Sequence, residues 1–195
     1  MDCARVVGIL LAAGAGSRFG GNKLEAMFGD RMLGTYAAAT MATLGLARSI
    51  AIHDPAHVAL AHALAGLGFT LIANTDPTAG LSRSLRLATH AATATQADAM
   101  LVCLADMPFV TTDHMCTLID TADANHVVAT AAGDIRMPPA VFPRALWPAL
   151  ANMTGDSGAR ALLADAKAVS SPPEHCVDID TMADLERMTR IGVSE

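Results

Sequence analysis

The sequence predicts a mostly parallel α/β sheet with helices on both faces, and three observations support this. Short, continuous apolar runs of the kind found in strands buried on both sides recur along the chain. Segments of helical composition separate these runs, and a Gly-rich segment follows the first one. No repeat, long linker or charge block interrupts the 195 residues, so we expect one domain, 1–195.

The predicted strands and helices alternate over the first two thirds of the chain. The strands are expected at Arg5–Leu11, Ser49–His53, Phe69–Ala73, Ala99–Leu104 and Val127–Ala131. The helices between and after them are expected at Leu33–Leu44, Ala56–Ala65, Arg83–Ala92 and Asp113–Ala122.

The last third is less regular. A strand is expected at Ala140–Phe142, after two prolines, and another at Val177–Ile179. Asp156 is expected to cap a helix at Ser157–Leu163. Thr181, followed three residues later by Asp184, resembles a capping box with Asp in place of Glu, so a final helix should begin there.

The amino-acid composition argues against several classes of protein: disordered, nucleic-acid-binding and membrane-associated ones. Apolar residues make up 52% of the chain and charged ones 16%, which favours a compact globule over disorder. The net charge of −6 disfavours nucleic acid as a partner. Four cysteines without a Cys-x-x-Cys pair predict free thiols in a reducing compartment. The apolar run 6–13 is too short to span a bilayer, so we expect a cytoplasmic protein with no membrane partner.

The loop after the first strand is the strongest candidate for a ligand site, because ligands of open parallel sheets bind at the carboxyl ends of the strands. Glycines recur in it, and their backbone N–H groups can cradle phosphate oxygens. Arg18 and Lys23 add two cations. Leu24 after the lysine excludes a Walker A loop, and Phe19 breaks a dinucleotide fingerprint. The alternative is a flexible Gly turn with two solvated cations.

Carboxylates follow two of the other strands. Asp106 follows the most apolar run, which places it at the same sheet edge, where a lone carboxylate suits Mg²⁺. It could instead be a turn residue before Pro108. Asp178 and Asp180 alternate across a strand end, so only one of them should face the site. The alternative for Asp180 is that it, or Thr181, caps the last helix.

Five segments in this order resemble the motifs of one family, the nucleotidyltransferases related to molybdopterin cytidylyltransferase and molybdopterin guanylyltransferase. The fold that the resemblance implies is Rossmann-like and also serves sugar-nucleotide pyrophosphorylases, which form nucleotide-diphospho-sugars. The segments span nearly the whole chain: 11–23 (Leu-Ala-Ala-Gly-x-x-Ser-Arg-x-Gly-x-x-Lys), 80–85, 104–108, 155–160 and 178–181.

The resemblance implies residue roles. Arg18, Lys23 and Asp106 would be catalytic, with Mg²⁺ on Asp106 and Asp180. Asp156 and Arg136 would lie on the acceptor side, although Asp156 could be a helix cap alone and Ser82 could simply cap the helix at 83–92. The nucleotide-binding residues implied are Leu11, Ala12, Ala13, Gly14, Gly16, Ser17, Gly80, Ser82 and Ser84.

The implied reaction is transfer of CMP from CTP to molybdopterin, or its molybdenum form, with release of pyrophosphate. A molybdenum hydroxylase or its chaperone would be the partner. Ala13 stands where guanylyl-transferring relatives resemble Gly, and its methyl group should favour a pyrimidine. Met137 and Pro139 depart from the family pattern near the expected acceptor site. A sugar-phosphate or phospholactate acceptor, GTP as donor, and a non-catalytic pterin- or nucleotide-binding protein therefore stay open.

Overall fold

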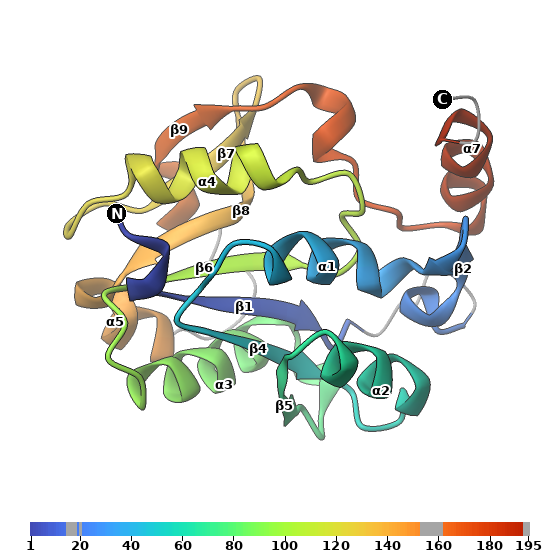
Figure 1. Ribbon diagram of the computed structural model, residues 1–195, viewed down its shortest axis with the longest axis horizontal. Coiled ribbons are helices and arrows are strands. Elements are labelled where there is room, and N and C mark those ends of the chain that lie inside the picture. The colour runs from blue at the N-terminus through green and yellow to red at the C-terminus, as the bar shows by residue number, and fades with distance from the viewer. Residues whose placement is uncertain (15–18, 20, 153–161, 193–195) are drawn as a thin grey trace.

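A seven-stranded sheet forms the centre of the molecule in the computed structural model, which describes residues 1–14, 19, 21–152 and 162–192. Its strand order is β5-β4-β1-β6-β8-β7-β9, and β8 alone runs antiparallel to its neighbours. The strands are β1 (Val6–Ala12), β4 (Arg48–His53), β5 (Thr70–Ala73), β6 (Ala99–Leu104), β7 (Val128–Ala132), β8 (Ile135–Pro143) and β9 (Lys167–Ser170). The predicted mostly parallel α/β class is confirmed (Figure 1).

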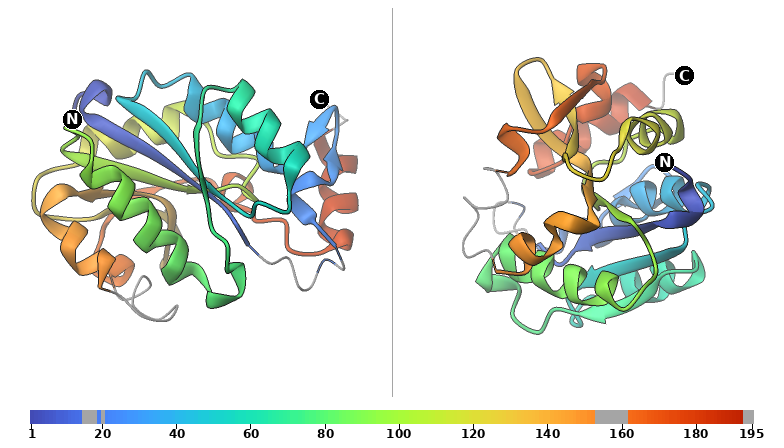
Figure 2. Two further views of the ribbon diagram at one scale, coloured as in Figure 1. Left: turned by 90° about the horizontal axis from the view of Figure 1, so that it is seen from below. Right: turned by 90° about the vertical axis from the view of Figure 1, so that its left-hand side faces the viewer.

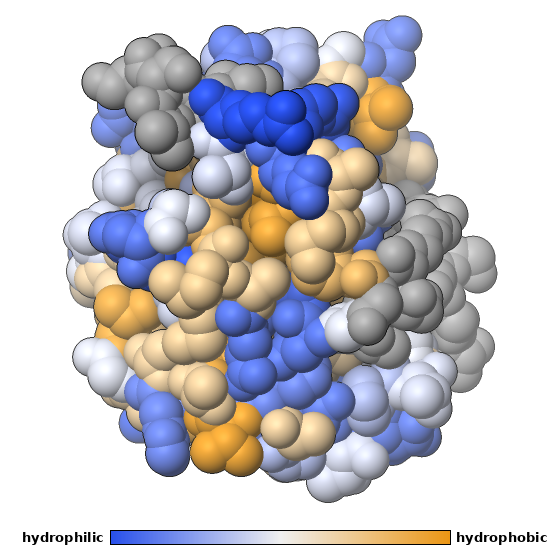
Figure 3. Space-filling model, turned by 90° about the vertical axis from the view of Figure 1, so that its right-hand side faces the viewer, coloured by the Kyte–Doolittle hydropathy of each residue, from blue (hydrophilic) through white to orange (hydrophobic). Residues whose placement is uncertain are grey.

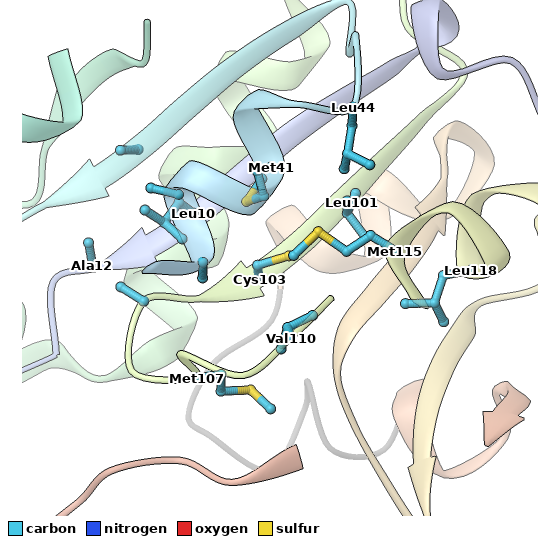
Figure 4. Close-up of a cluster of buried hydrophobic side chains, with 14 of the residues drawn as sticks. Leu10, Ala12, Met41, Leu44, Leu101, Cys103, Met107, Val110, Met115 and Leu118 are labelled. Atoms are coloured by element: carbon cyan, nitrogen blue, oxygen red, sulfur yellow. The ribbon is translucent and has the colours of Figure 1, made fainter. Parts of the chain in front are cut away.

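Helices cover both faces of the sheet (Figure 2). On one face lie α1 (Tyr36–Ala42), α2 (Val58–Gly66) and α4 (Thr112–Thr121), and on the other α3 (Leu81–Thr93) and α5 (Trp147–Ala151). Alternate residues of β1 supply the two cores, because successive side chains of a strand point to opposite faces. Leu10 belongs to the core cluster that includes α1 and α4, and Figure 4 shows it beside Met41 of α1, whereas Ile9 belongs to the cluster on the α3 side.

A short hairpin of β2 (Met27–Phe28) and β3 (Arg31–Met32) packs against the C-terminal helix α7 (Met182–Gly192). Phe28, Ile179 and Leu185 share this third apolar cluster. Thr181 caps α7 as the sequence predicts: the Asp184 N–H donates to Thr181 Oγ1 (3.1 Å), and the Thr181 N–H donates to Asp184 Oδ2 (3.1 Å). This packing brings the end of the chain back to the edge at which β1 and β6 end (Figure 1).

Two predictions about local structure are wrong. Val177–Ile179 is not a strand: it joins no sheet ladder, and the Ile179 N–H bonds the Asp106 carbonyl instead (3.0 Å). Ser82 is not the cap of α3, because the helix begins at Leu81 after Gly80, and Ser82 is buried in the first turn. The predicted helix 157–163 and its cap Asp156 lie largely outside the described residues.

The four cysteines are free thiols, as predicted. Within the described part of the chain, every helix is too short or too polar to cross a bilayer.

Candidate active site

A pocket of about 490 Å³ lies at the carboxyl ends of β1 and β6, where the sequence predicts the ligand site. Figure 3 looks onto this edge, where apolar side chains lie between strongly hydrophilic ones. The pocket is lined by the ends of β1 and β6, by the segments that follow β1, β5 and β6, and by the start of α3. The lining residues are Leu11, Ala13, Gly14, Lys23, Leu24, Pro77, Thr78, Gly80, Leu81, Ser84, Leu104 and Asp106.

The charged centre of the site is Lys23, whose ammonium joins two carboxylates. Lys23 Nζ lies 2.7 Å from Asp106 Oδ2 and 2.7 Å from Asp180 Oδ1. Only 9% of the Lys23 side chain is exposed, so the charge depends on these partners. Asp106 Oδ1 is buried and has no hydrogen-bond partner among the residues described. The centre therefore has one cation, two converging carboxylates and one unused acceptor.

Local packing holds Lys23 at this point. Lys23–Glu25 form a 3₁₀ turn, and Glu25 Oε1 accepts a hydrogen bond from the Leu60 N–H at the start of α2 (3.0 Å). Gly34 packs below this turn: a Cβ there would come within 2.9 Å of Leu60 Cδ1 and 3.1 Å of Leu24 Cβ. A larger residue at Gly34 would therefore press on Leu24, the neighbour of Lys23 in this turn.

Backbone hydrogen bonds place the two carboxylates. The Ala105 N–H donates to the Leu11 carbonyl (3.1 Å), which fixes the residue before Asp106 beside the end of β1. The bond from the Ile179 N–H to the Asp106 carbonyl draws 178–180 to the same point. Of the two residues considered for the cap of α7, Thr181 forms the capping hydrogen bonds, and Asp180 pairs with Lys23. The metal role of Asp180 stays a prediction.

The charges shift each other's titration. Burial alone would lower the pKa of Lys23, but the charge of Asp106 and hydrogen bonds to Asp106 and Asp180 raise it above its ordinary value. Lys23 is therefore a fixed cation at neutral pH. Burial raises the pKa of Asp178, as do the neighbouring charges of Asp180 and Asp106. Three carboxylates therefore lie close together at this edge, and Lys23 forms ion pairs with two of them, Asp106 and Asp180.

The opposite wall of the pocket is the segment 77–84. Gly80 has φ +81°, a left-handed conformation that favours glycine, and it lets the chain turn directly into α3. Gly14 faces this wall across the pocket, and a Cβ built on it would meet no atom within 4 Å. Packing against the described residues does not require glycine at position 14, and the open space beside it would let a ligand approach the backbone closely.

Asn74, at the end of β5, is a residue that the sequence analysis did not single out. It is fully buried and hydrogen-bonded to Ser84 and Arg83 in the first turn of α3. A polar residue directly after a predicted strand was the available signal.

The structure brings together most of the predicted site residues that it describes. Ala12 is an exception: it is fully buried in the core beneath α1, so it supports the loop without lining the pocket. Ser82 also lies off the pocket lining. Of the predicted site residues, the following line the pocket: Leu11, Ala13, Gly14, Lys23, Gly80, Ser84 and Asp106. Outside the described residues are Gly16, Ser17, Arg18 and Asp156.

Arg136 lies near the start of β8. Because β8 runs antiparallel to β6, these first residues lie at the same sheet edge as Asp106. Arg136 Nε is buried and has no hydrogen-bond partner in the described part of the protein. Within that part, no group of three or more His, Cys, Asp or Glu side chains is arranged to hold a metal ion.

Comparison with known proteins finds chains that are similar over nearly the full length. The purine catabolism protein PucB of Bacillus subtilis is 26% identical over 95% of this chain and 96% of its own. Rv0371c of Mycobacterium tuberculosis, solved in complex with manganese, is 25% identical over 95% of this chain and 98% of its own, with a TM-score of 0.77. A nucleotidyl transferase of Methanothermobacter thermautotroptrophicus, 21% identical over 97% of this chain and 98% of its own, shares the fold with a TM-score of 0.82.

The family profile of the MobA-like NTP transferase domain matches residues 8–171, which include the loop after β1, the 77–84 wall and Asp106. The chain therefore belongs to the MobA-like NTP transferase family and is a nucleotidyltransferase.

Proposed function

We propose that this chain transfers CMP from CTP to the terminal phosphate of a molybdopterin-type acceptor in the cytoplasm and releases pyrophosphate. The observation that carries the proposal is the Lys23 ammonium, held by Asp106 and Asp180 beside a pocket with a Gly14 cradle and an apolar wall. A cation beside bare backbone suits a triphosphate, and the leucines around it suit a flat base.

Positioning and charge stabilisation would carry the reaction. An oxygen of the acceptor phosphate forms a bond to the α-phosphorus of CTP, and the bond from that phosphorus to the bridging oxygen breaks. The electron pair leaves with pyrophosphate. The acceptor phosphate is already ionised at neutral pH, so no strong general base is needed. Lys23, and Arg18 by resemblance, would hold the phosphates in line.

The carboxylates fit a divalent cation such as Mg²⁺. Asp106 and Asp180 already converge on one cationic atom, and Asp106 Oδ1 is a buried oxygen without a partner among the described residues. One or two carboxylates are the usual protein share of a Mg²⁺ site at substrate phosphates. Bound there, Mg²⁺ would neutralise negative charge on the triphosphate. The manganese complex of Rv0371c supports this assignment.

The base assignment depends on Ala13. It lines the pocket and is 4% exposed, so its methyl group occupies space next to the ligand. This space favours a single pyrimidine ring over a purine.

The acceptor assignment depends on Arg136, whose unpartnered guanidinium nitrogen at the site edge suits a phosphate or a pterin carbonyl. The product would pass to a molybdenum hydroxylase or its chaperone. The purine catabolism name of the Bacillus subtilis relative fits a partner that oxidises purines.

The test is pyrophosphate release with each of the four NTPs and molybdopterin, followed by mass analysis of the product. We expect release with CTP and a product that carries one added CMP. Preference for GTP would overturn the base assignment. Release only with a sugar phosphate or a phospholactate would overturn the acceptor assignment. Failure of every NTP and acceptor to release pyrophosphate would overturn catalysis by this site.

A further inference from the structure

Asn74 is a fully buried polar side chain that contacts the 77–84 wall through Arg83 and Ser84. Its backbone N–H donates to the His53 carbonyl at the end of β4 (2.7 Å). Its side chain reaches Asp76, Arg83 and Ser84. One residue therefore ties two strand ends to the turn before α3 and to the first turn of α3.

The partners of Asn74 fix which way its amide points. Asn74 Oδ1 lies 2.9 Å from Arg83 Nε and 3.1 Å from the Asp76 backbone N, and both of these groups can only donate. Reversing the amide would set an NH₂ group against two donors. The NH₂ group must therefore face Ser84, and Asn74 Nδ2 donates to Ser84 Oγ at 3.1 Å.

This donation fixes the polarity of the Ser84 hydroxyl. The Ser84 oxygen is used as an acceptor, so its own hydrogen must be donated elsewhere. Ser84 lines the pocket, and none of the described residues accepts that hydrogen. Thr78, the other hydroxyl of this wall, already donates to Asp76 Oδ1 (2.7 Å). Among the described lining residues, Ser84 is thus the hydroxyl whose hydrogen is left for a ligand.

We propose that Asn74 is a positioning residue that holds Ser84 as a hydrogen-bond donor to an acceptor atom of the nucleobase. The inference rests on the proposed nucleotide function and adds that the 77–84 wall donates a hydrogen bond to the base through Ser84. The charged groups of the lining, Lys23 and Asp106, suit the phosphates, and its apolar residues Leu11, Leu81 and Leu104 suit a base. Ser84 lines the same pocket and is the neutral hydroxyl that we assign to the base. A carbonyl oxygen or unprotonated ring nitrogen is the partner that such a donor requires.

The variant Asn74→Asp tests the hydrogen bond that Asn74 donates to Ser84 separately from the hydrogen bonds that Asn74 accepts. A carboxylate can still accept from Arg83 and Asp76, and the adjacent Arg83 guanidinium offsets its charge. The carboxylate cannot donate a hydrogen bond, so the Ser84 hydroxyl donates to the carboxylate and no longer donates to the base. We expect CTP to bind about three- to tenfold more weakly, the scale of one neutral hydrogen bond. KM should rise by the same factor while kcat stays near wild type, because Lys23 and Asp106 are untouched.

Calorimetric titration with CTP and Mg²⁺ measures this for the wild type, N74D, S84A and N74D/S84A, with the thermal midpoint as the check on folding. Asn125→Asp, in an exposed turn, is the matched control for the added charge and should bind as the wild type does. S84A should weaken binding as much as N74D, and the double variant no further, because Asn74 acts through Ser84.

The possible results distinguish failure of the proposed nucleotide function from failure of the role proposed for Asn74. A wild type that binds no NTP overturns the proposed function itself. A wild type that binds CTP while folded N74D binds it equally well overturns the role of Asn74. So does additive weakening in the double variant, which would mean that Asn74 acts on the site without Ser84. If N74D does not fold, S84A decides: unchanged CTP affinity in S84A overturns the proposal.

Discussion

Lys23→Met tests whether one cation holds the acidic edge of the site together. The substitution keeps most of the unbranched apolar stem and removes the ammonium that lies 2.7 Å from both Asp106 and Asp180. Removing one partner of a buried ion pair costs about 3–5 kcal/mol, because the other charge is left buried and unpaired. Asp106 is 19% exposed and Asp180 43%, so water recovers part of this cost. We therefore expect a loss of about 2–3 kcal/mol.

The assay is thermal unfolding with and without Mg²⁺. For a domain of this size, about 2–3 kcal/mol corresponds to a midpoint lowered by roughly 4–12 °C. Without the ammonium, the carboxylates are free to share a divalent cation, so Mg²⁺ should raise the midpoint of K23M more than that of the wild type. At a hundredfold excess over its dissociation constant, a ligand of the folded state restores about 2.7 kcal/mol.

The matched control is Arg5→Met, which removes a cation from the exposed Arg5–Asp98 ion pair. Exposed pairs contribute little, so its midpoint should stay close to that of the wild type and should respond to Mg²⁺ only as much as the wild type does. The reasoning is refuted if K23M unfolds at the wild-type midpoint, or if Mg²⁺ shifts K23M and the wild type equally.

Three further changes test other parts of the site and the fold. Asp106→Asn should abolish turnover in a pyrophosphate assay while the circular dichroism spectrum is retained; a near-normal rate would exclude Asp106 from the chemistry. Ala13→Gly should raise the ratio of kcat/KM for GTP to kcat/KM for CTP, by an amount equivalent to at most about 1–3 kcal/mol of activation free energy. An unchanged ratio would assign the base preference to another residue. Burial, and then the charge of His175, lower the pKa of His114, so the fold favours its neutral form. That stability is present above about pH 6.5 and is lost as the pH falls through the lowered pKa. His114→Gln should therefore lose less stability than the wild type in urea titrations between pH 7.5 and 5, and parallel losses would contradict this.

The central strands were predictable from the sequence because they are buried on both faces. Nothing polar interrupts a run such as Ala99–Leu104, and its predicted bounds agree with β6. The peripheral elements gave no such signal. β9 (Lys167–Ser170) lies at the sheet edge with three of its four residues exposed, so its sequence lacks an apolar run. The two-residue strands of the hairpin are too short to show a period.

Val177–Ile179 shows the opposite error, an apolar pattern that did not become a strand. Ile179 is fully buried, as the pattern implies, but it packs against the hairpin and α7, and its N–H bonds Asp106. The burial of Ile179 was therefore predicted correctly, but the pairing of this segment with a strand of the sheet was not. Apolar residues indicate that a segment is buried, whereas the partner that takes its backbone hydrogen bonds is decided by the rest of the fold.

The central strands, the sheet edge that carries the pocket and the chemical types of residue present there follow from local composition and from the order of strands along the chain. Which of these groups meet is set by the three-dimensional fold. Lys23 is 83 residues from Asp106 and 157 from Asp180 along the chain, and folding brings both carboxylates to 2.7 Å from one nitrogen. The direction of the Asn74 amide, likewise, follows from donors on Arg83 and Asp76 that become its neighbours only when α3 packs beside β5. Contacts of this kind depend on three-dimensional distances, which no local pattern specifies.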